Sequence, residues 1–231
     1  MTSANSIANS VPVMNMLHVA SAQERVNQIT DEFLGMLPDA AELSASQRRG
    51  IIARYSAVLE GNFIYWMTGA YLSAKTDEAR SIIIDNLREE IGDCHPGMLR
   101  RFAIASQAVP TEADAADVYQ DLSNVRLFVG RLSTVQMILM MAFFEGLIQK
   151  FMPYLADLAA RQGSREMEYT DVHGVCDIAH TAGLFRAFES EAALCPLEHS
   201  ADPFEGVLLL RTLLETIVHG KERGANSAVA H

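Results

Sequence analysis

One short segment, residues 171–180, gathers side chains that could bind a metal ion. It reads Asp-Val-His-Gly-Val-Cys-Asp-Ile-Ala-His. On a helix, His173, Asp177 and His180 follow one another at spacings of four and three residues, so their side chains project from one face. Imidazole nitrogens and a carboxylate oxygen are ligands that iron, manganese and zinc accept. The alternative is a hydrated polar face, which the apolar neighbours of these residues disfavour because unpaired polar groups are costly in a half-buried helix.

A second candidate ligand is Glu145. The residues around it, 137–144 and 146–148, carry no charged side chain. A carboxylate in such surroundings has to be protonated, paired with a cation or bound to a metal. The alternative interpretation is an acid that reaches the surface or pairs with an arginine.

A third candidate group is the pair Glu89 and Glu90, followed by His95. Residues five or six positions apart do not share a helical face. The group can therefore converge only if the helix breaks between them, and Gly92 and Pro96 predict such a break. The alternative is an exposed acidic face beside a loop histidine.

Taken together, these segments supply three histidines and three carboxylates from three predicted helices. That set matches the ligand demand of a carboxylate-bridged dinuclear iron or manganese centre. Ferritin-like diiron bundles use two Glu-x-x-His motifs, whereas this chain has one comparable pair, Asp177 and His180. The sequence therefore disfavours a ferritin-like centre.

The elements that must position these residues are predicted to be helices. The 231 residues contain only 14 Gly and 7 Pro, and 49% of them are hydrophobic against 20% charged. Few helix breakers and many helix formers predict an all-α protein, and this hydrophobicity excludes a disordered chain. With 18 basic and 29 acidic residues, the net charge of −11 argues against binding to a nucleic-acid backbone.

The expected architecture is a single all-α bundle of about seven helices in residues 21–220, with flexible tails in 1–20 and 221–231. Helical segments are predicted near residues 23–37, 46–74, 76–92, 96–106, 110–124, 133–160, 170–193 and 202–220. We expect no strand and no membrane span, since the longest apolar stretch, 135–144, is about half the length of one. No secretory signal is recognised, and three cysteines are too few and too irregular for a disulfide framework. A cytoplasmic location is therefore expected.

In this order, the motifs resemble the haem-oxygenase-like diiron oxidase and oxygenase superfamily, over about residues 55–191. The resemblance rests on Asn86-Leu87-Arg88-Glu89-Glu90-Ile91-Gly92, His95-Pro96, Leu99 and Phe102, Glu145, and His173-x-x-x-Asp177-x-x-His180. It implies the seven-helix fold that haem oxygenase shares with thiaminase-like and pyrroloquinoline-quinone-synthase-like proteins.

The resemblance also implies the metal ligands. By position they are Glu89, His95, Glu145, His173, Asp177 and His180, which would hold two Fe(II) ions, with manganese as an alternative, and O2 as the co-substrate. Glu145 is the expected bridging carboxylate. Glu89 is preferred to Glu90 because the first of the paired glutamates is the usual match. Some N-oxygenating members use a further carboxylate from the preceding long helix, and Glu60 is the candidate for it here.

Two departures from the family's sequence pattern argue against two of its known activities. Members that modify their own tyrosine carry a tyrosine just before the central glutamate, whereas this chain has Phe144 there. Haem oxygenase needs an axial histidine on its first helix, and the only early histidine, His18, falls in the predicted tail. Neither self-modification nor haem oxidation is expected.

The implied function is an O2-dependent oxidation of an amino acid or related small carboxylate, in natural-product biosynthesis. Oxidative C–C cleavage, N-oxygenation and nitrile formation all occur in the family, and an external electron donor would be compatible with each. Basic residues that could receive the substrate carboxylate are Arg100, Arg101, Arg126, Lys150 and Arg186, and aromatic residues that could line its pocket are Tyr65, Trp66, Phe128, Phe143 and Phe144.

Two other classes remain open at this stage. Cys94 and His95, with His173 and Cys176, form a nominal zinc set, although it leaves Glu145 and Asp177 unexplained. The other is a metal-free, thiaminase-like ligand-binding or interaction protein. We expect no nucleic-acid or membrane partner, and the oligomeric state, including a homodimer, is left open.

Overall fold

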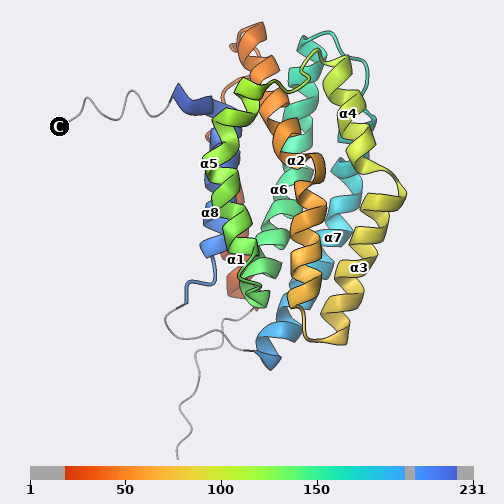
Figure 1. The fold of residues 1–231 in the computed structure, drawn as a ribbon, viewed down its shortest axis with the longest axis vertical. Helices are drawn as coiled ribbons and strands as arrows, with labels where there is room; N and C mark the ends of the chain where they lie inside the picture. Colours follow the sequence, from red (N-terminus) through yellow and green to blue (C-terminus); the bar gives the residue numbers. More distant parts are fainter. Residues whose placement is uncertain (1–18, 196–200, 223–231) are drawn as a thin grey trace, which may run out of the picture.

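The computed structural model describes residues 19–195 and 201–222, which form eight α-helices and a final 3₁₀ turn (Figure 1). The helices are α1 (Val19–Leu34), α2 (Ala45–Ser73), α3 (Asp77–Gly92), α4 (His95–Ala105), α5 (Glu112–Val129), α6 (Thr134–Arg161), α7 (Glu168–Leu194) and α8 (Glu205–His219), and the turn is η1 (Gly220–Glu222). The described ranges contain no strand, so the all-α prediction is confirmed; the eight α-helices correspond to the eight predicted segments, one more than the seven-helix architecture that the resemblance implies. The predicted tails lie outside these ranges except for residues 19–20 and 221–222, which are helical.

The predicted helix boundaries agree best with the structure where a capping residue marks the start of the helix. Thr76 caps α3, and its hydroxyl accepts a hydrogen bond from the backbone N–H of Ala79 at 3.2 Å. Thr170, where the predicted segment 170–193 begins, instead lies inside α7, and its hydroxyl donates to the carbonyl of Met167 at 2.9 Å. Helix α5 runs five residues beyond its predicted end because residues 125, 128 and 129 are buried, and packing prolongs the helix.

Helix α6 is the core of the bundle. It packs against α1, α2, α7 and α8, and over residues 137–148 it is apolar on all sides apart from Glu145, as a helix segment surrounded by other helices should be. Its length and apolar composition would also suit a membrane span, but 83% of its most apolar stretch is buried inside the protein. The burial marks α6 as a core helix, and Glu145 lies in the middle of it.

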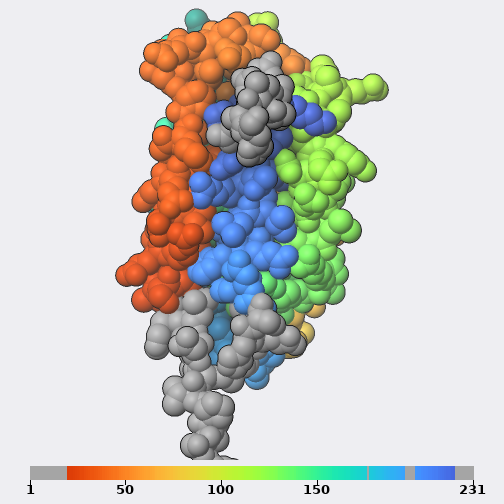
Figure 2. Space-filling view, turned by 90° about the vertical axis from the view of Figure 1, so that its left-hand side faces the viewer, coloured from red at the N-terminus to blue at the C-terminus, as the bar shows by residue number. Residues whose placement is uncertain are grey.

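One face of the bundle is closed by α8, which lies between α1 and α5 (Figure 2). Its apolar stripe, Leu210, Leu213, Leu214 and Ile217, is fully buried. This side of the molecule is therefore solid packing, remote from the histidines of α7.

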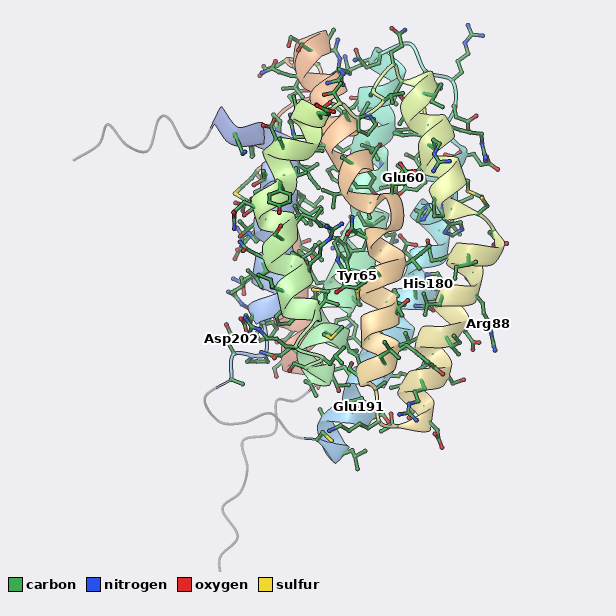
Figure 3. The ribbon with its side chains drawn as sticks, in the orientation of Figure 1. Glu60, Tyr65, Arg88, His180, Glu191 and Asp202 are labelled. Atoms are coloured by element: carbon green, nitrogen blue, oxygen red, sulfur yellow. The ribbon has the colours of Figure 1, made fainter. Side chains whose placement is uncertain are left out.

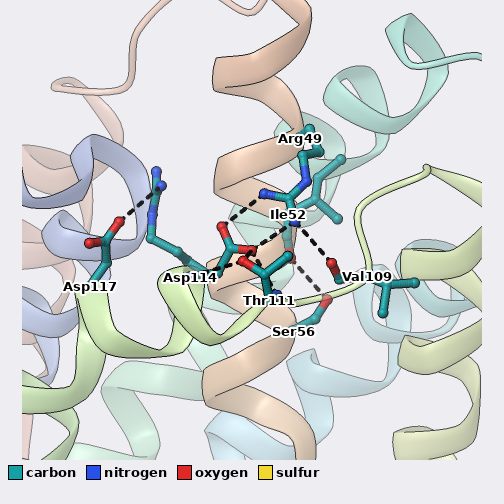
Figure 4. Close-up of polar contacts among 8 residues, drawn as sticks. Arg49, Ile52, Ser56, Val109, Thr111, Asp114 and Asp117 are labelled. Carbon is teal, nitrogen blue, oxygen red and sulfur yellow. Dashed lines mark hydrogen bonds and ion pairs between the residues drawn. The ribbon is translucent and has the colours of Figure 1, made fainter.

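The junction between α2 and α5 is held by an ion pair between the half-buried Arg49 and the buried Asp114 (Figure 4). Arg49 donates to both carboxylate oxygens of Asp114, at 2.9 and 2.7 Å, and to the carbonyl of Val109 at 3.0 Å. Thr111 adds two further donors to the same carboxylate, its N–H at 2.8 Å and its hydroxyl at 2.6 Å. The negative charge of Asp114 is thus fully compensated by its neighbours.

Helix α2 is interrupted in its middle. The backbone leaves helical geometry at Glu60 (ψ 96°) and Gly61 (φ 87°), and the positive φ favours glycine at the second position. Beyond the break, the side-chain amide of Asn62 donates to the carbonyl of Val58 at 2.6 Å, which satisfies part of the disrupted ladder. The break turns Glu60 outward toward Arg100 of α4 while Leu59 and neighbouring apolar residues face inward.

Candidate metal centre

A first group of metal-ligating side chains comes from three helices: Glu90 from α3, His95 from α4 and His173 from α7. All three are buried, and one potential ligand atom from each lies within 4.8 Å of the others. Glu90 Oε1 is 2.8 Å from His95 Nδ1 and 3.8 Å from His173 Nε2. The predicted break before His95 makes this possible, because Cys94 adopts a left-handed conformation (φ 60°) that lets α4 fold back over α3.

A second group combines Glu145 of α6 with Asp177 and His180 of α7. Its three ligand atoms also lie within 4.8 Å of one another, and all three residues are buried. His180 Nδ1 is 3.5 Å from Glu145 Oε2 and 3.9 Å from Asp177 Oδ1. The helical spacing of α7 therefore distributes its three polar residues over two adjoining groups, as its one-sided pattern predicts.

The electrostatics of the second group show an excess of negative charge. Glu145 is only 2% exposed, and its Oε1 has no hydrogen-bond partner among the described residues. Burial raises the pKa of Glu145, an effect that nearby Glu90 reinforces and His180 opposes. Burial alone would lower the pKa of His180, but its contacts with Glu145 and Glu89 raise it to about 9. These groups share too few positive charges, so a bound cation would relieve the imbalance.

His173 is held ready to act as a ligand. Its Nδ1 donates to the backbone carbonyl of Tyr169 at 2.8 Å, which leaves the Nε2 lone pair directed toward Glu90. Burial lowers the pKa of His173, so the ring is neutral. A carbonyl partner that fixes the tautomer and orientation of an imidazole is typical of metal-binding histidines.

Glu90, and not Glu89 as predicted, lies among the metal-ligating side chains of the first group. The Glu90 side chain is 6% exposed and belongs to the first group, whereas that of Glu89 is 55% exposed and belongs to neither. Neighbouring residues on a helix project about 100° apart, so only one of the two can face the interior. Glu89 instead accepts a hydrogen bond from His180 Nε2 at 2.9 Å, which directs Nδ1 toward Glu145.

Glu60 and Cys94 lie outside both groups. Glu60 is paired with Arg100, and its side chain is 42% exposed. Cys94 is exposed, and the side chain of Cys176 falls outside the described part of the structure. Among the described residues no cysteine joins a metal-ligating group, and the nominal zinc set, which also needs Cys176, stays a prediction.

A pocket opens onto both groups from α2 and α4. Figure 3 labels Glu60 and His180 in the half of the bundle that α2, α3, α4 and α7 form. Its walls are apolar apart from the ligating residues and one hydroxyl, that of Tyr169; the other lining residues are Leu59, Phe63, Ile64, Pro96, Leu99, Phe144 and Ile148. Of the aromatic residues predicted to line it, only Phe144 does so, and Tyr65, Trp66, Phe128 and Phe143 lie elsewhere.

None of the basic residues proposed as substrate anchors lines this pocket. Four of them are engaged within the fold: Arg100 with Glu60, Arg101 with Glu168, Arg126 with Asn62 and Lys150 with Asp31. Arg186 is exposed on the outer side of α7.

Tyr169 is a pocket residue that was not among those predicted for the site. Its hydroxyl lies 2.8 Å from that of Tyr55, and both rings are buried beside the first group, with Tyr169 4.3 Å from the ring of His173. A signal existed, because Tyr169 precedes His173 by one helical turn and so shares its face.

Comparison with known proteins agrees with this geometry. Residues 51–210 match a family described as iron-containing redox enzymes, a span that includes every residue of both groups. A search of curated proteins finds no match. The chain therefore belongs to this iron-containing redox enzyme family of the haem-oxygenase-like superfamily.

Proposed function

We propose that the protein is an O2-dependent oxidoreductase with two adjacent iron sites. One site uses Glu90, His95 and His173, and the other uses Glu145, Asp177 and His180. The observation that carries the proposal is the pair of adjoining buried groups, each a mixture of carboxylate and imidazole. The family supports iron and redox chemistry, and the number of sites rests on the two groups.

The residues fit this metal. Nitrogen and oxygen donors without thiolate suit iron or manganese, and the unpartnered Oε1 of Glu145 is an acceptor that a cation would satisfy. Two divalent ions would offset three buried carboxylates, which otherwise face only three imidazoles. When bound, iron supplies the one-electron steps needed to activate O2.

The protein's own contribution is positioning and the exclusion of water. Tyr169 fixes His173 through its carbonyl, and Glu89 fixes His180 through its carboxylate. The apolar side chains of α2, α4 and α6 keep bulk water from the ligating face of the pocket. Either hydroxyl of the Tyr55–Tyr169 pair can donate to the other, and where Tyr55 donates, the proton of Tyr169 is left for a molecule bound in the pocket.

The proposed substrate is an amino acid or related small carboxylate with an apolar side chain. Apolar walls would hold the side chain, while the polar end would lie against the two ligand groups, since no basic side chain lines the pocket. Oxidative C–C cleavage, N-oxygenation and nitrile formation are the reactions to test, with O2 as the oxidant. A cytoplasmic location and an external electron donor belong to the same proposal.

The first test is metal content and O2 consumption. The protein is loaded with Fe(II) without oxygen, freed of excess metal, and then mixed with panels of amino acids and fatty acids under O2. We expect about two iron ions per chain and faster O2 consumption with at least one compound. A chain that retains fewer than two ions, or zinc in preference to iron, would contradict the two-iron assignment.

A matched control is available in Glu60→Gln. This change also removes a carboxylate from the side of the pocket formed by α2, but the structure pairs Glu60 with Arg100. Glu60→Gln should therefore keep both iron ions. A loss of iron in this variant would show that Glu60 is a metal ligand.

A further inference from the structure

The outer side of α7 is apolar and exposed. Val175 is 72% exposed and Ile178 is 56% exposed, and Ala179 and Ala182 are exposed beside them. At about 100° per residue, these four positions form one stripe along the helix. Large apolar side chains gathered on one helix face indicate a contact surface more often than scattered ones do.

The exposed stripe does not belong to the metal centre. The ligating residues of α7, His173, Asp177 and His180, are buried on the opposite side of the helix. In the view of Figure 1, α7 lies behind α2 and α3, and it packs on α6, α3, α4 and α1. These neighbours cover its inner side and leave the stripe facing solvent.

A charged residue of opposite sign stands at each end of the stripe. Asp171 lies one turn before Val175, and Arg186 lies one turn after Ala182; both are exposed. Neither side chain makes an ion pair with a residue in the described ranges. Midway between the two charges lie Ile178 and Ala179.

We infer that two copies of the chain pair through this stripe, with their α7 helices antiparallel. A two-fold axis between Ile178 and Ala179 would place Asp171 of each copy against Arg186 of the other. The same axis would bring Val175 against Ala182, a large side chain against a small one. The surface is thus complementary to itself in charge and in size, which is what a two-fold interface requires.

The next charges outward also fit this arrangement. Glu189 of one copy would lie beside Glu168 of the other, two like charges, but Arg101 already pairs with Glu168 within its own chain. That arginine would stand between the two acids. Because the stripe spans only about two helical turns, and its flanking charges extend the contact to about four, the contact is smaller than a standard interface, and we expect a dimer that dissociates on dilution.

Charge reversal tests this pairing. Asp171→Arg and Arg186→Asp should each weaken the dimer by about tenfold or more, because each places like charges opposite one another. A mixture of the two variants should form a heterodimer about as tight as the natural dimer, since both contacts then join Asp to Arg. Sedimentation of the iron-loaded protein over a concentration series measures each equilibrium.

Two more variants make the outcome decisive. Ile178→Glu should abolish the dimer, whereas the control Arg25→Asp, an exposed charge reversal on α1, should leave it unchanged. Circular dichroism and iron content, unchanged in all variants, would show that the fold is intact. A chain that is monomeric at every concentration, a dimer indifferent to both reversals, or a mixture that fails to associate would each overturn the inference.

Discussion

Two buried carboxylates in this molecule have nearly the same exposure and opposite electrostatics. Asp114, at the junction of α2 and α5, is 6% exposed, and Glu145, in the middle of α6, is 2% exposed. Burial tends to raise the pKa of Asp114, but hydrogen bonds from Arg49 and Thr111 outweigh it and hold the pKa below its usual range. For Glu145 burial prevails, and the pKa is raised.

The opposite pKa directions distinguish a carboxylate that stabilises the fold, Asp114, from one whose charge the protein's own groups do not compensate, Glu145. Asp114 finds an arginine and two Thr111 donors within its own chain. Glu145 meets a histidine and other acids, and one of its oxygens has no hydrogen-bond partner among the described residues. A buried charge that its neighbours do not compensate indicates a functional site when it lines a pocket.

The largest expected effect comes from removing the Glu145 carboxylate in the presence of iron. Glu145→Gln should lower the retained iron from two ions to one and slow substrate-dependent O2 consumption by about 100-fold or more, since a charged ligand is lost. Iron analysis and an oxygen electrode measure the two effects. Asp114→Asn is the matched control, because it neutralises an equally buried acid far from the pocket and should keep both ions.

The same control variant should show the largest loss of stability. Asp114→Asn leaves the Arg49 guanidinium without its charged partner, and we expect the free energy of unfolding of the metal-free protein to fall by about 2–3 kcal/mol. Urea unfolding at neutral pH measures it. An unchanged midpoint would show that the junction is not a stabilising ion pair.

The stabilisation by Asp114 should depend on pH in a defined direction. Because the folded pKa lies below the unfolded one, the contribution is full above the unfolded pKa, about 4, and is lost as the pH falls through the folded value. The difference between the natural protein and Asp114→Asn should therefore be constant from pH 5 to 7 and shrink below about pH 4. A difference that grows on acidification would contradict the assignment.

Much of the fold was predictable because local signals determine it. Thr76 and Pro96 mark helix starts whatever the tertiary structure, and the apolar run of α6 predicts a core helix. The prediction failed where packing overrides local preference. Helix α5 continues to Val129 because its last turn is buried, and Thr170 becomes an interior residue of α7.

The site was predictable to the extent that spacing on one helix could reveal it. His173, Asp177 and His180 come together because they share one face of α7. The choice between Glu89 and Glu90 depends on how α3 is rotated against α7, which no local pattern records. The pairing of Glu60 with Arg100 is likewise a contact across α2 and α4, and spacing along the chain could not predict it.

A smaller effect distinguishes the two neighbouring glutamates. Glu90→Gln removes a buried member of the first group and should abolish one iron site, whereas Glu89→Gln should weaken iron binding at His180 only about tenfold, as loss of an orienting partner does. Competition with a chelator of known affinity measures both. Equal losses in the two variants would show that Glu89 is itself a ligand.

The smallest expected effect is on stability, and it has opposite signs for the two carboxylates. In the metal-free protein, Glu145→Gln replaces an uncompensated buried acid with a neutral side chain of the same shape, and it should raise the free energy of unfolding by about 1 kcal/mol, whereas Asp114→Asn lowers it. Iron should invert the order of the natural protein and Glu145→Gln, because a ligand that binds only the folded state adds stability in proportion to its affinity. Thermal unfolding with and without Fe(II) measures this crossover. If Glu145→Gln were the less stable protein in both conditions, Glu145 would be a structural residue like Asp114, and the contrast between the two regions would disappear.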